Sequence, residues 1–397
     1  MLRVQVRLRA RKQNYDIKIG AVLLSELGHT VRMALGARAG RLAVISNQTV
    51  LDLFGEPAIR SLRKASFEVS HWLMKDGERH KSMRSLEHAL AFLTEFGLER
   101  NDVVVALGGG VVGDVAGFAA ATYLRGVAFI QVPTTLLAQI DASVGGKTGV
   151  NMPAGKNLVG AFHQPSLVVI DINTLRTLPR RELTAGWCEA VKQGAAGDRK
   201  LFDQTVRLLR KRGADLGLCY QDEESQTGVC ATIAAHCRFK ASIVAGDERE
   251  EIGRNDSRSR RILNFGHTTA HALEAVTGYR RLRHGEAVGY GMLVAGEISK
   301  SLGMLGPSEL ESLREAVGLC GPLPRADDLA VDEIIRAMRL DKKSVGGVTK
   351  WVLLERIGRA RIVNGDEIDK RTLRASLRAG LRSIYRIRGS SSLPNSK

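Results

Sequence analysis

A run of apolar, mostly β-branched residues, VVVAL at 103–107, leads directly into a glycine-rich turn, GGGVVGD at 108–114. Strands that are apolar throughout are typical of parallel sheets covered by helices on both faces. Similar runs recur at 42–46, 67–70, 129–132 and 167–170, and helical patterns at 85–96 and 111–123 lie between them. Residues 1–178 are therefore expected to form an α/β nucleotide-binding domain around a parallel sheet.

The glycine turn matches the pattern GxGxxG through Gly108, Gly110 and Gly113. Glycines after a strand allow a pyrophosphate to approach the backbone N–H groups at a helix N-terminus. The acidic residue usually found about 20 positions later is absent, because 127–135 reads VAFIQVPTT. Two interpretations stay open: a dinucleotide site, or a tight turn that needs glycine only for packing.

After residue 179 the β-rich runs mostly stop. Helical patterns follow at 181–197, 200–211, 225–246, 265–277, 284–303, 308–317 and 331–339, and a hairpin is expected at 351–354 and 362–363. We expect a mostly α-helical domain over 179–388 and a disordered tail over 389–397. The active site is expected in the cleft between the two domains.

The five cysteines are odd in number and form no CxxC pair, which favours a reducing, cytoplasmic location over a disulfide framework. The N-terminal segment 1–12 alternates apolar residues with arginine, which predicts a strand. No apolar run approaches the roughly 18 residues that a membrane span needs. We therefore expect a soluble protein without membrane contact.

Residues 370–397 contribute +8 of the net charge of +17, since they contain eight Lys or Arg and no acid. Four arginines recur every four residues, opposite four apolar side chains: Arg374, Arg378, Arg382 and Arg386 against Leu373, Leu377, Leu381 and Ile384. This spacing predicts an amphipathic surface helix with a basic outer face. Nucleic-acid binding is not expected, because a single aromatic residue, Tyr385, lies among the arginines and no series of stacking residues is present.

Three histidines are concentrated in 266–289. A helix over 264–277 would bring His267 and His271 onto one face, and His284 follows. The segment GWCEAVKQG adds Glu189 to an otherwise apolar setting. Two imidazoles and a carboxylate suit zinc or a similar divalent ion, although such histidine pairs also occur as ordinary helix content.

Taken together, these segments resemble the 3-dehydroquinate synthase family of the sugar-phosphate cyclase superfamily, from about residue 40 to 365. The motifs that carry the resemblance are GERHKS (77–82), ALGGGVVGDVAGFAAATYLRG (106–126), QVPTTLLAQIDASVGGKTGVN (131–151), AGKNLVGAFHQP (154–165), LPRRELTAGWCEAVKQG (178–194), KASIVAGDERE (240–250), RRILNFGHTTAHALE (260–274), HGEAVGYGM (284–292) and DKK (341–343).

The resemblance implies a two-domain homodimer that uses NAD and one divalent metal, zinc or cobalt. The implied substrate is the anionic sugar phosphate 3-deoxy-D-arabino-heptulosonate 7-phosphate. In that family NAD oxidises a ring hydroxyl, phosphate leaves by β-elimination, the hydride returns, and an intramolecular aldol step closes 3-dehydroquinate. The family therefore shows no net redox change.

The resemblance also implies residue roles. Glu189, His267 and His284 would bind the metal, whereas His271 would act on the substrate. The other implied catalytic or substrate-contacting residues are Asp141, Lys147, Asn157, Lys192, Lys240, Glu250, Arg260, Asn264, Lys342 or Lys343, and Arg125 from the dimer partner. The implied NAD contacts are Glu78, Lys81, Gly109, Gly110, Val111, Asp114, Thr134, Thr135, Leu137, Asp141, Lys147, Lys156, Asn157, Thr177, Leu178 and Glu182.

The sequence departs from the family pattern at three places. Residues 251–259, EIGRNDSRS, are an insertion between two active-site segments, which we expect to form a tolerated surface loop. Asn47 stands where the family has an acid near the adenosine. Cys188 replaces a small residue beside Glu189 and is expected to be a buried, small hydrophobic residue.

Three other functions remain as alternatives. A sister cyclase would act on another sugar phosphate, but it would be expected to change the substrate-side residues Lys240, Arg260, Asn264 and His271. A metal- and NAD-dependent polyol dehydrogenase would release NADH on turnover. A basic protein that binds nucleic acid through 370–397 is the weakest alternative.

Overall fold

The structure is a computed structural model that describes residues 14–36, 39–215, 223–251, 253–340 and 349–390. The strand expected within 1–12 lies outside these residues. Of the disordered tail expected over 389–397, residues 391–397 also lie outside them, whereas 389–390 belong to the last helix, so this part of the prediction was wrong. Among the described helices, none is both long and apolar enough to cross a membrane.

A six-stranded parallel sheet forms the centre of the N-terminal part, with the order β1-β8-β5-β4-β2-β3. Its strands are β1 (Asp16–Gly20), β2 (Arg41–Asn47), β3 (Glu68–Met74), β4 (Val103–Gly108), β5 (Ala128–Pro133) and β8 (Leu167–Asp171). The five apolar runs therefore become β2, β3, β4, β5 and β8, as predicted. The edge strand β1 was missed, because IKI offers only a short alternation.

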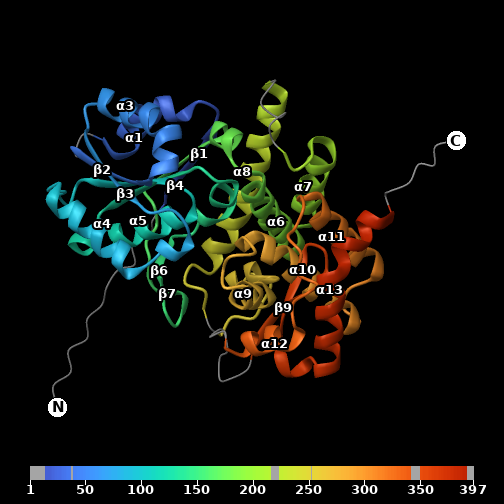
Figure 1. Ribbon diagram of the computed structural model, residues 1–397. Coiled ribbons are helices and arrows are strands. Elements are labelled where there is room, and N and C mark those ends of the chain that lie inside the picture. Colours follow the sequence, from blue (N-terminus) through green and yellow to red (C-terminus); the bar gives the residue numbers. More distant parts are fainter. Residues whose placement is uncertain (1–13, 37–38, 216–222, 252, 341–348, 391–397) are drawn as a thin grey trace, which may run out of the picture.

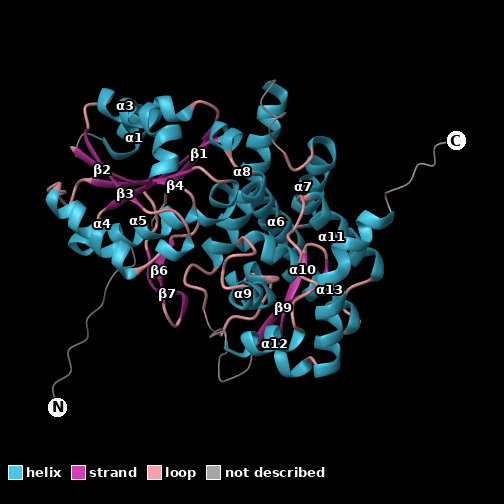
Figure 2. Ribbon diagram, in the orientation of Figure 1, coloured by secondary structure: helices cyan, strands magenta, loops and turns pink. Residues whose placement is uncertain are grey.

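Helices cover both faces of this sheet (Figure 2). On one face, α1 (Leu27–Leu35) and α3 (Glu56–Lys64) pack against Leu42, Val44 and Val105. On the other face, α4 (Met83–Glu95) and α5 (Gly110–Thr122) pack against Ala43, Ile45 and Val104. Neighbouring residues of one strand thus belong to opposite cores, which explains why central strands such as β2 and β4 are mostly apolar and buried.

The C-terminal part is mostly helical, as predicted. Its helices are α6 (Arg180–Gly197), α7 (Arg199–Arg212), α8 (Glu223–Gly246), α9 (His267–Val276), α10 (His284–Ser301), α11 (Pro307–Leu319), α12 (Val331–Leu340) and α13 (Lys370–Ser390). The predicted hairpin is present as antiparallel β9 (Lys350–Arg356) and β10 (Arg359–Asn364). Helix α10 is buried from Gly285 to Ser299, so it forms the centre of this part.

The basic amphipathic helix is α13. Leu377 and Leu381 are buried, Arg378 and Arg382 are exposed, and Arg374 forms an ion pair with Asp332 of α12 at 2.5 Å. The side chains of Ile384 and Arg386 lie outside the described residues. The basic outer face was therefore correctly predicted as far as residue 383.

The two parts share one hydrophobic core. Leu136, Ile140 and Val168 from the sheet part belong to the same cluster as Trp187 and Tyr290 of the helical part. Glu189 on α6 and Asp141 beside the sheet are therefore held on elements that pack directly against each other. The boundary at 178 remains a prediction, although α6 begins at Arg180.

A second, antiparallel sheet was not predicted. It consists of β6 (Lys147–Met152) and β7 (Gly155–Phe162), which project from the sheet part beside the helical part (Figure 1). Gly149 and Gly160 face each other in this hairpin, where a Cβ on Gly160 would lie 2.0 Å from the Thr148 carbonyl oxygen. Glycine-rich strands without alternating hydrophobicity give little sequence signal.

The helix predicted over 264–277 was wrong at its start. Residues Arg260–Asn264 form a 3₁₀ turn, and α9 begins at His267 after Gly266. Gly266 has φ +79° and packs against α10, where a Cβ on Gly291 would lie 1.9 Å from the Gly266 carbonyl oxygen. The close approach of these two glycines fixes the angle at which the histidine-bearing helices cross.

Gly291→Ala should therefore destabilise the protein by about 1–3 kcal/mol, because the added methyl group must push α9 away from α10. Gly228→Ala in α8 is the matched control. A methyl group added there would meet no described atom within 4 Å beyond its own helix, so this change should stabilise the helix by about 0.5–1 kcal/mol. Thermal unfolding followed by circular dichroism measures both changes. Equal melting temperatures for the two variants would contradict the packing argument.

Candidate functional site

The residues expected to contact NAD gather at the carboxyl edge of the parallel sheet. Glu78 follows β3, Gly109 follows β4, Thr134 follows β5 and Thr177 follows β8. In parallel α/β sheets this edge is where ligands bind. The remaining members of the set lie on the same connections or on the β6–β7 hairpin, except Glu182, which lies in the first turn of α6: Lys81, Gly110, Val111, Asp114, Thr135, Leu137, Asp141, Lys147, Lys156, Asn157, Leu178 and Glu182.

The glycine turn contains glycines at a helix N-terminus and glycines that allow close packing. Helix α5 begins at Gly110 with Gly109 as its N-cap, so its first N–H groups are available at the sheet edge. A Cβ on Gly113 would lie 2.9 Å from Gln131 Oε1, and one on Gly117 would lie 2.5 Å from Thr148. The later glycines thus serve packing, whereas Gly109 and Gly110 stand at the helix end.

Lys81 connects this edge to the hairpin. Its Nζ forms an ion pair with Asp114 of α5 and donates a hydrogen bond to Asn157 Oδ1 of β7. The Lys81 carbonyl oxygen also accepts a hydrogen bond from Asn151 N at 2.8 Å. Burial raises the pKa of Asp114, and the positive charge of Lys81 opposes that shift.

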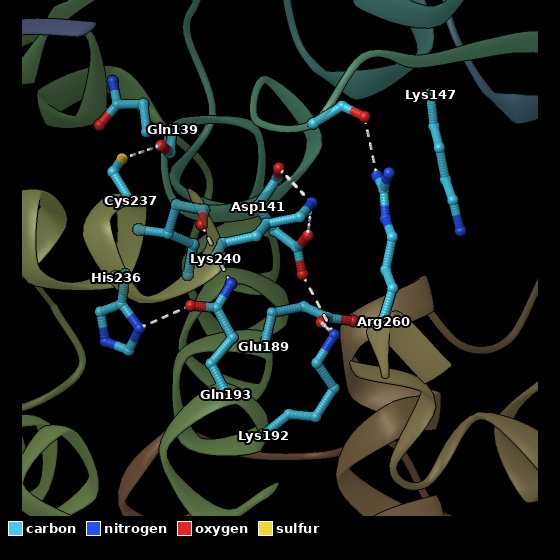
Figure 3. Close-up of polar contacts among 12 residues, drawn as sticks. Gln139, Asp141, Lys147, Glu189, Lys192, Gln193, His236, Cys237, Lys240 and Arg260 are labelled. Carbon is cyan, nitrogen blue, oxygen red and sulfur yellow. Dashed lines mark hydrogen bonds and ion pairs between the residues drawn. The ribbon is translucent and has the colours of Figure 1, made fainter. Parts of the chain in front are cut away.

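Asp141 lies on a π-helical turn, Ala138–Ala142, where the sheet part meets the helical part. Its Oδ2 accepts a hydrogen bond from Lys192 of α6 at 3.1 Å, and its Oδ1 accepts one from Lys240 of α8 (Figure 3). Burial raises the pKa of Asp141, but the positive charges of Lys192 and Lys240 outweigh burial and hold it well below its usual range. The sequence did not predict this arrangement.

A buried histidine contacts the turn that carries Asp141 through Gln193. Gln193 donates from Nε2 to the Ile140 carbonyl oxygen at 3.0 Å, and its Oε1 lies 3.0 Å from Nδ1 of His236 (Figure 3). His236 is fully buried and also lies 3.0 Å from Thr205 Oγ1. Burial lowers the pKa of His236 to about 3, so the ring is neutral and donates from Nδ1 to Gln193.

Glu189, His267 and His284 come together across three helices. One ligand atom from each lies within 4.8 Å of the others. Glu189 is 2% exposed, and neither of its carboxylate oxygens accepts a hydrogen bond among the described residues. Lys192 Nζ lies 2.5 Å from Glu189 Oε2 as an ion pair without hydrogen-bond alignment. Such a carboxylate facing two imidazoles fits a divalent cation.

Glu274 on α9 is a site residue that the sequence analysis missed. It is 3% exposed, and it accepts hydrogen bonds from Lys156 at 2.9 Å and from His284 Nδ1 at 3.3 Å. Burial raises the pKa of Glu274, but the charges of His284 and Lys156 lower it to about 2, so the carboxylate is ionised. Its place seven residues after His267, two turns along one helix face, was the available signal.

His271 lies one turn from His267, with ring centroids 5.6 Å apart, and 6.0 Å from the ring of His284. A second possible metal-binding group consists of His271, Glu274 and His284. The geometry alone therefore allows two overlapping ligand sets that share His284. Only the set with Glu189 contains a buried carboxylate without a hydrogen bond among the described residues.

The residues that flank the inserted loop, Glu250 and Arg260, still lie where the two parts of the chain meet. Glu250 forms an ion pair with Lys147 of β6 and accepts a hydrogen bond from Asn264 Nδ2 at 2.9 Å. Arg260 donates to the carbonyl oxygens of Gly145 at 2.9 Å and Glu248 at 2.6 Å. The expected cations are thus present at the junction of the two parts.

Other expected residues lie apart or outside the described part. Arg125 is exposed on a turn at the surface with φ +68°, and Lys342 and Lys343 lie outside the described residues. Asn47 caps α2 (Gln48–Val50) and donates to Asp76 Oδ1 at 3.1 Å, so a carboxylate still lies beside this position.

Cys188 is fully buried, as expected. A hydrogen bond with Cys320 and burial raise the pKa of its thiol well above the usual range. The thiolate needed for oxidation is therefore disfavoured next to Glu189.

Comparison with known proteins decides the family. Residues 71–185 match the family model described as 3-dehydroquinate synthase N-terminal, and residues 186–344 match the one described as 3-dehydroquinate synthase C-terminal. The chain belongs to the 3-dehydroquinate synthase family. A curated 3-dehydroquinate synthase from Nostoc punctiforme is 42% identical over 369 residues, which cover 92% of this chain and 96% of that protein.

Solved structures of related cyclases share the fold of this family member. A 2-epi-5-epi-valiolone synthase from Streptomyces hygroscopicus subsp. jinggangensis, with NAD+ and Zn2+ bound, is 29% identical with a TM-score of 0.80, and the match covers 96% of this chain and 100% of that one. A 2-deoxy-scyllo-inosose synthase complexed with carbaglucose-6-phosphate, NAD+ and Co2+ has a TM-score of 0.76 at 24% identity, covering 92% and 97%. The predicted two-part α/β and helical fold is confirmed.

The buried His236 should make stability fall in mild acid. Its pKa of about 3 in the folded protein lies below the value of about 6.5 in an unfolded chain. Between these two pKa values, His236 is protonated in the unfolded chain but stays neutral in the folded protein. The free energy of unfolding therefore decreases as pH falls below about 6.5, by up to about 1.4 kcal/mol per pH unit. Urea unfolding of wild type and His236→Gln at pH 5 to 7.5 measures the difference. Parallel pH profiles would contradict it.

Proposed function

We propose that this protein is an active 3-dehydroquinate synthase that converts 3-deoxy-D-arabino-heptulosonate 7-phosphate to 3-dehydroquinate and phosphate. The proposal rests chiefly on Glu189, whose buried carboxylate accepts no hydrogen bond from the described residues and faces His267 and His284. This group lies one helical turn from Lys192, which bonds Asp141 beside the sheet edge. The residues proposed for metal, nucleotide and substrate therefore adjoin one another. The family's curated members support the same activity.

The residues fit one divalent metal, zinc or cobalt, and NAD. Glu189, His267 and His284 would hold the metal, with positions open for substrate oxygens. The connections after β3, β4, β5 and β8 would hold NAD, with 1–178 as the nucleotide-binding domain and 179–388 as the metal- and substrate-binding domain. When bound, the metal polarises a substrate hydroxyl and NAD accepts and later returns a hydride. The related cyclase with NAD+ and Zn2+ bound supports both cofactors.

The cationic side chains would bind the anionic groups of the substrate. Lys147 and Arg260 now pair with Glu250 and with backbone carbonyl oxygens, and Lys240 pairs with Asp141. A phosphate and a carboxylate together need several such donors. Lys192, Asn157, Asn264 and His271 complete this set, and the leaving phosphate itself can take the proton in β-elimination. Asp141, held ionised by two lysines, would orient both of them toward the substrate.

The protein is also proposed to act as a cytoplasmic homodimer in which Arg125 completes the partner's site. Arg125 is exposed on a turn that carries left-handed φ angles at Leu124 and Arg125, +49° and +68°. Leu124 is also exposed, as are Leu158 and Phe162 of the β6–β7 hairpin. An exposed arginine beside apolar side chains is typical of an interface between protein chains.

In an activity assay, the protein should release phosphate and 3-dehydroquinate in equal amounts. Purified protein receives the heptulosonate phosphate, catalytic NAD and zinc, and both products are quantified. Net accumulation of NADH would instead identify a polyol dehydrogenase. Turnover of sedoheptulose 7-phosphate, but not of the heptulosonate, would identify a sister cyclase.

Metal content distinguishes the ligands from the substrate residue. Glu189→Ala, His267→Ala and His284→Ala should each lose bound zinc and activity, because each removes one of three ligands. His271→Ala should lose activity but retain the metal. Elemental analysis after dialysis measures the zinc content of each variant. Loss of zinc from His271→Ala would favour the ligand set of His271, Glu274 and His284.

Heterodimers test the role of Arg125. Arg125→Ala and Lys192→Ala should each be inactive alone, because each removes a substrate cation. Co-expression should restore about a quarter of wild-type activity, since half of the dimers are mixed and each has one intact site if Arg125 acts on the partner. No recovery in mixed dimers isolated with two affinity tags would contradict donation across subunits.

A further inference from the structure

Glu274 bonds both the β6–β7 hairpin and a histidine of the proposed metal group. Its two oxygens have different partners. Oε1 accepts a hydrogen bond from Lys156 Nζ on β7 at 2.9 Å, and Oε2 accepts one from His284 Nδ1 at 3.3 Å. The carboxylate is only 3% exposed, so water cannot easily take the place of either partner. Loss of either hydrogen bond would therefore leave a buried oxygen unsatisfied, which destabilises the folded protein.

The bond to His284 selects one tautomer of the ring. An ionised carboxylate can only accept hydrogen bonds, so Nδ1 of His284 carries the proton. In the neutral ring, Nε2 then keeps its lone pair, and this atom lies 3.6 Å from Glu189 Oε1. A histidine ligand commonly donates its other N–H to a carboxylate, which fixes the ring orientation and raises its basicity toward the metal.

The bond to Lys156 leads to the sheet edge. Lys156 Nζ lies 3.8 Å from Glu78 Oε1, and the same Glu78 oxygen accepts a hydrogen bond from Asn151 Nδ2 of β6 at 2.8 Å. Lys156 also lies 4.8 Å from the ring of Tyr279 just beyond α9. A continuous chain of polar contacts therefore runs from Glu78 through Lys156 and Glu274 to His284.

We propose that Glu274 is a positioning residue that couples the metal site to the nucleotide site through Lys156. This inference rests on the proposed function, because it needs metal at Glu189, His267 and His284 and nucleotide at the sheet edge. A nucleotide that orders Glu78 and Lys156 would also restrict the Glu274 side chain, whose Oε1 bonds Lys156. Less conformational entropy is then lost when metal binding orders Glu274 and His284, so the metal binds more tightly. The coupling is reciprocal, so metal tightens nucleotide binding by the same factor.

The experiment measures metal affinity without substrate or turnover. Apoprotein is titrated with Co²⁺ against a chelating competitor, with and without NAD, and the cobalt absorption spectrum is recorded. The variants are Glu274→Gln and Lys156→Gln. The controls are Glu297→Gln, a buried acid of α10 paired with Arg314, and Lys300→Gln, an exposed lysine of the same helix.

In wild type and both controls, NAD should tighten Co²⁺ binding about fivefold or more. Glu274→Gln should weaken Co²⁺ binding about tenfold without NAD and abolish the tightening by NAD, because its amide group cannot pair with Lys156 while accepting from His284 with the same strength. Lys156→Gln should keep most of the affinity without NAD but lose the tightening. The cobalt spectrum should stay that of wild type in both variants.

Three outcomes would overturn this inference alone. The first is that NAD does not change the Co²⁺ affinity of wild type, and the second is that NAD still increases the Co²⁺ affinity of the Glu274→Gln and Lys156→Gln variants. The third is a cobalt spectrum of Glu274→Gln that shows the loss of a ligand. The third would make Glu274 a metal ligand instead of a positioning residue. Failure of wild type to bind Co²⁺ through Glu189, tested with Glu189→Ala, would overturn the proposed function and this inference with it. Matching circular dichroism spectra show that each variant is folded.

Discussion

The site depends on a set of mutually neutralising buried charges where the two parts of the chain meet. Lys192 lies between Glu189 and Asp141, and Lys240 bonds the other oxygen of Asp141. A buried charge without a partner costs several kcal/mol, so none of these four side chains can be removed without penalty. Because Asp141 follows the sheet while Lys192 and Lys240 lie on α6 and α8, the same ion pairs fix the sheet edge against the helices.

The surrounding packing makes this arrangement rigid where the charges meet. Gln193 and the neutral His236 support the turn that carries Asp141, and Gly266 against Gly291 sets how α9 crosses α10. More exposed cations pair with groups that a substrate can replace, such as Glu250 for Lys147. The anionic substrate can therefore replace Glu250 as the partner of the exposed Lys147. Lys192 and Lys240, in contrast, retain their ion pairs with Asp141.

The sequence predicted the elements whose hydrophobic pattern is strong. The strands β2, β4, β5 and β8 and helices such as α6 and α10 were located within a few residues, because each buries most of its surface. The more exposed β3 was located at its start only. The β6–β7 hairpin was missed because its glycines serve backbone contact with no apolar alternation. Glu274 and His236 were missed for a different reason. Their roles depend on partners far away in sequence, and a single polar residue on a helix gives no sign of them.

The insertion shows how such a site tolerates a length change. One carboxylate, Asp247, accepts hydrogen bonds from the backbone N–H of Glu251 at 2.8 Å, just after the preceding active-site segment, and from Ser259 Oγ at 3.3 Å and the Arg260 N–H at 2.8 Å at the other end. Both ends of the loop are thus held at one point. Since loop-closure entropy grows only slowly with length, the added residues can extend outward without moving Arg260 from Gly145.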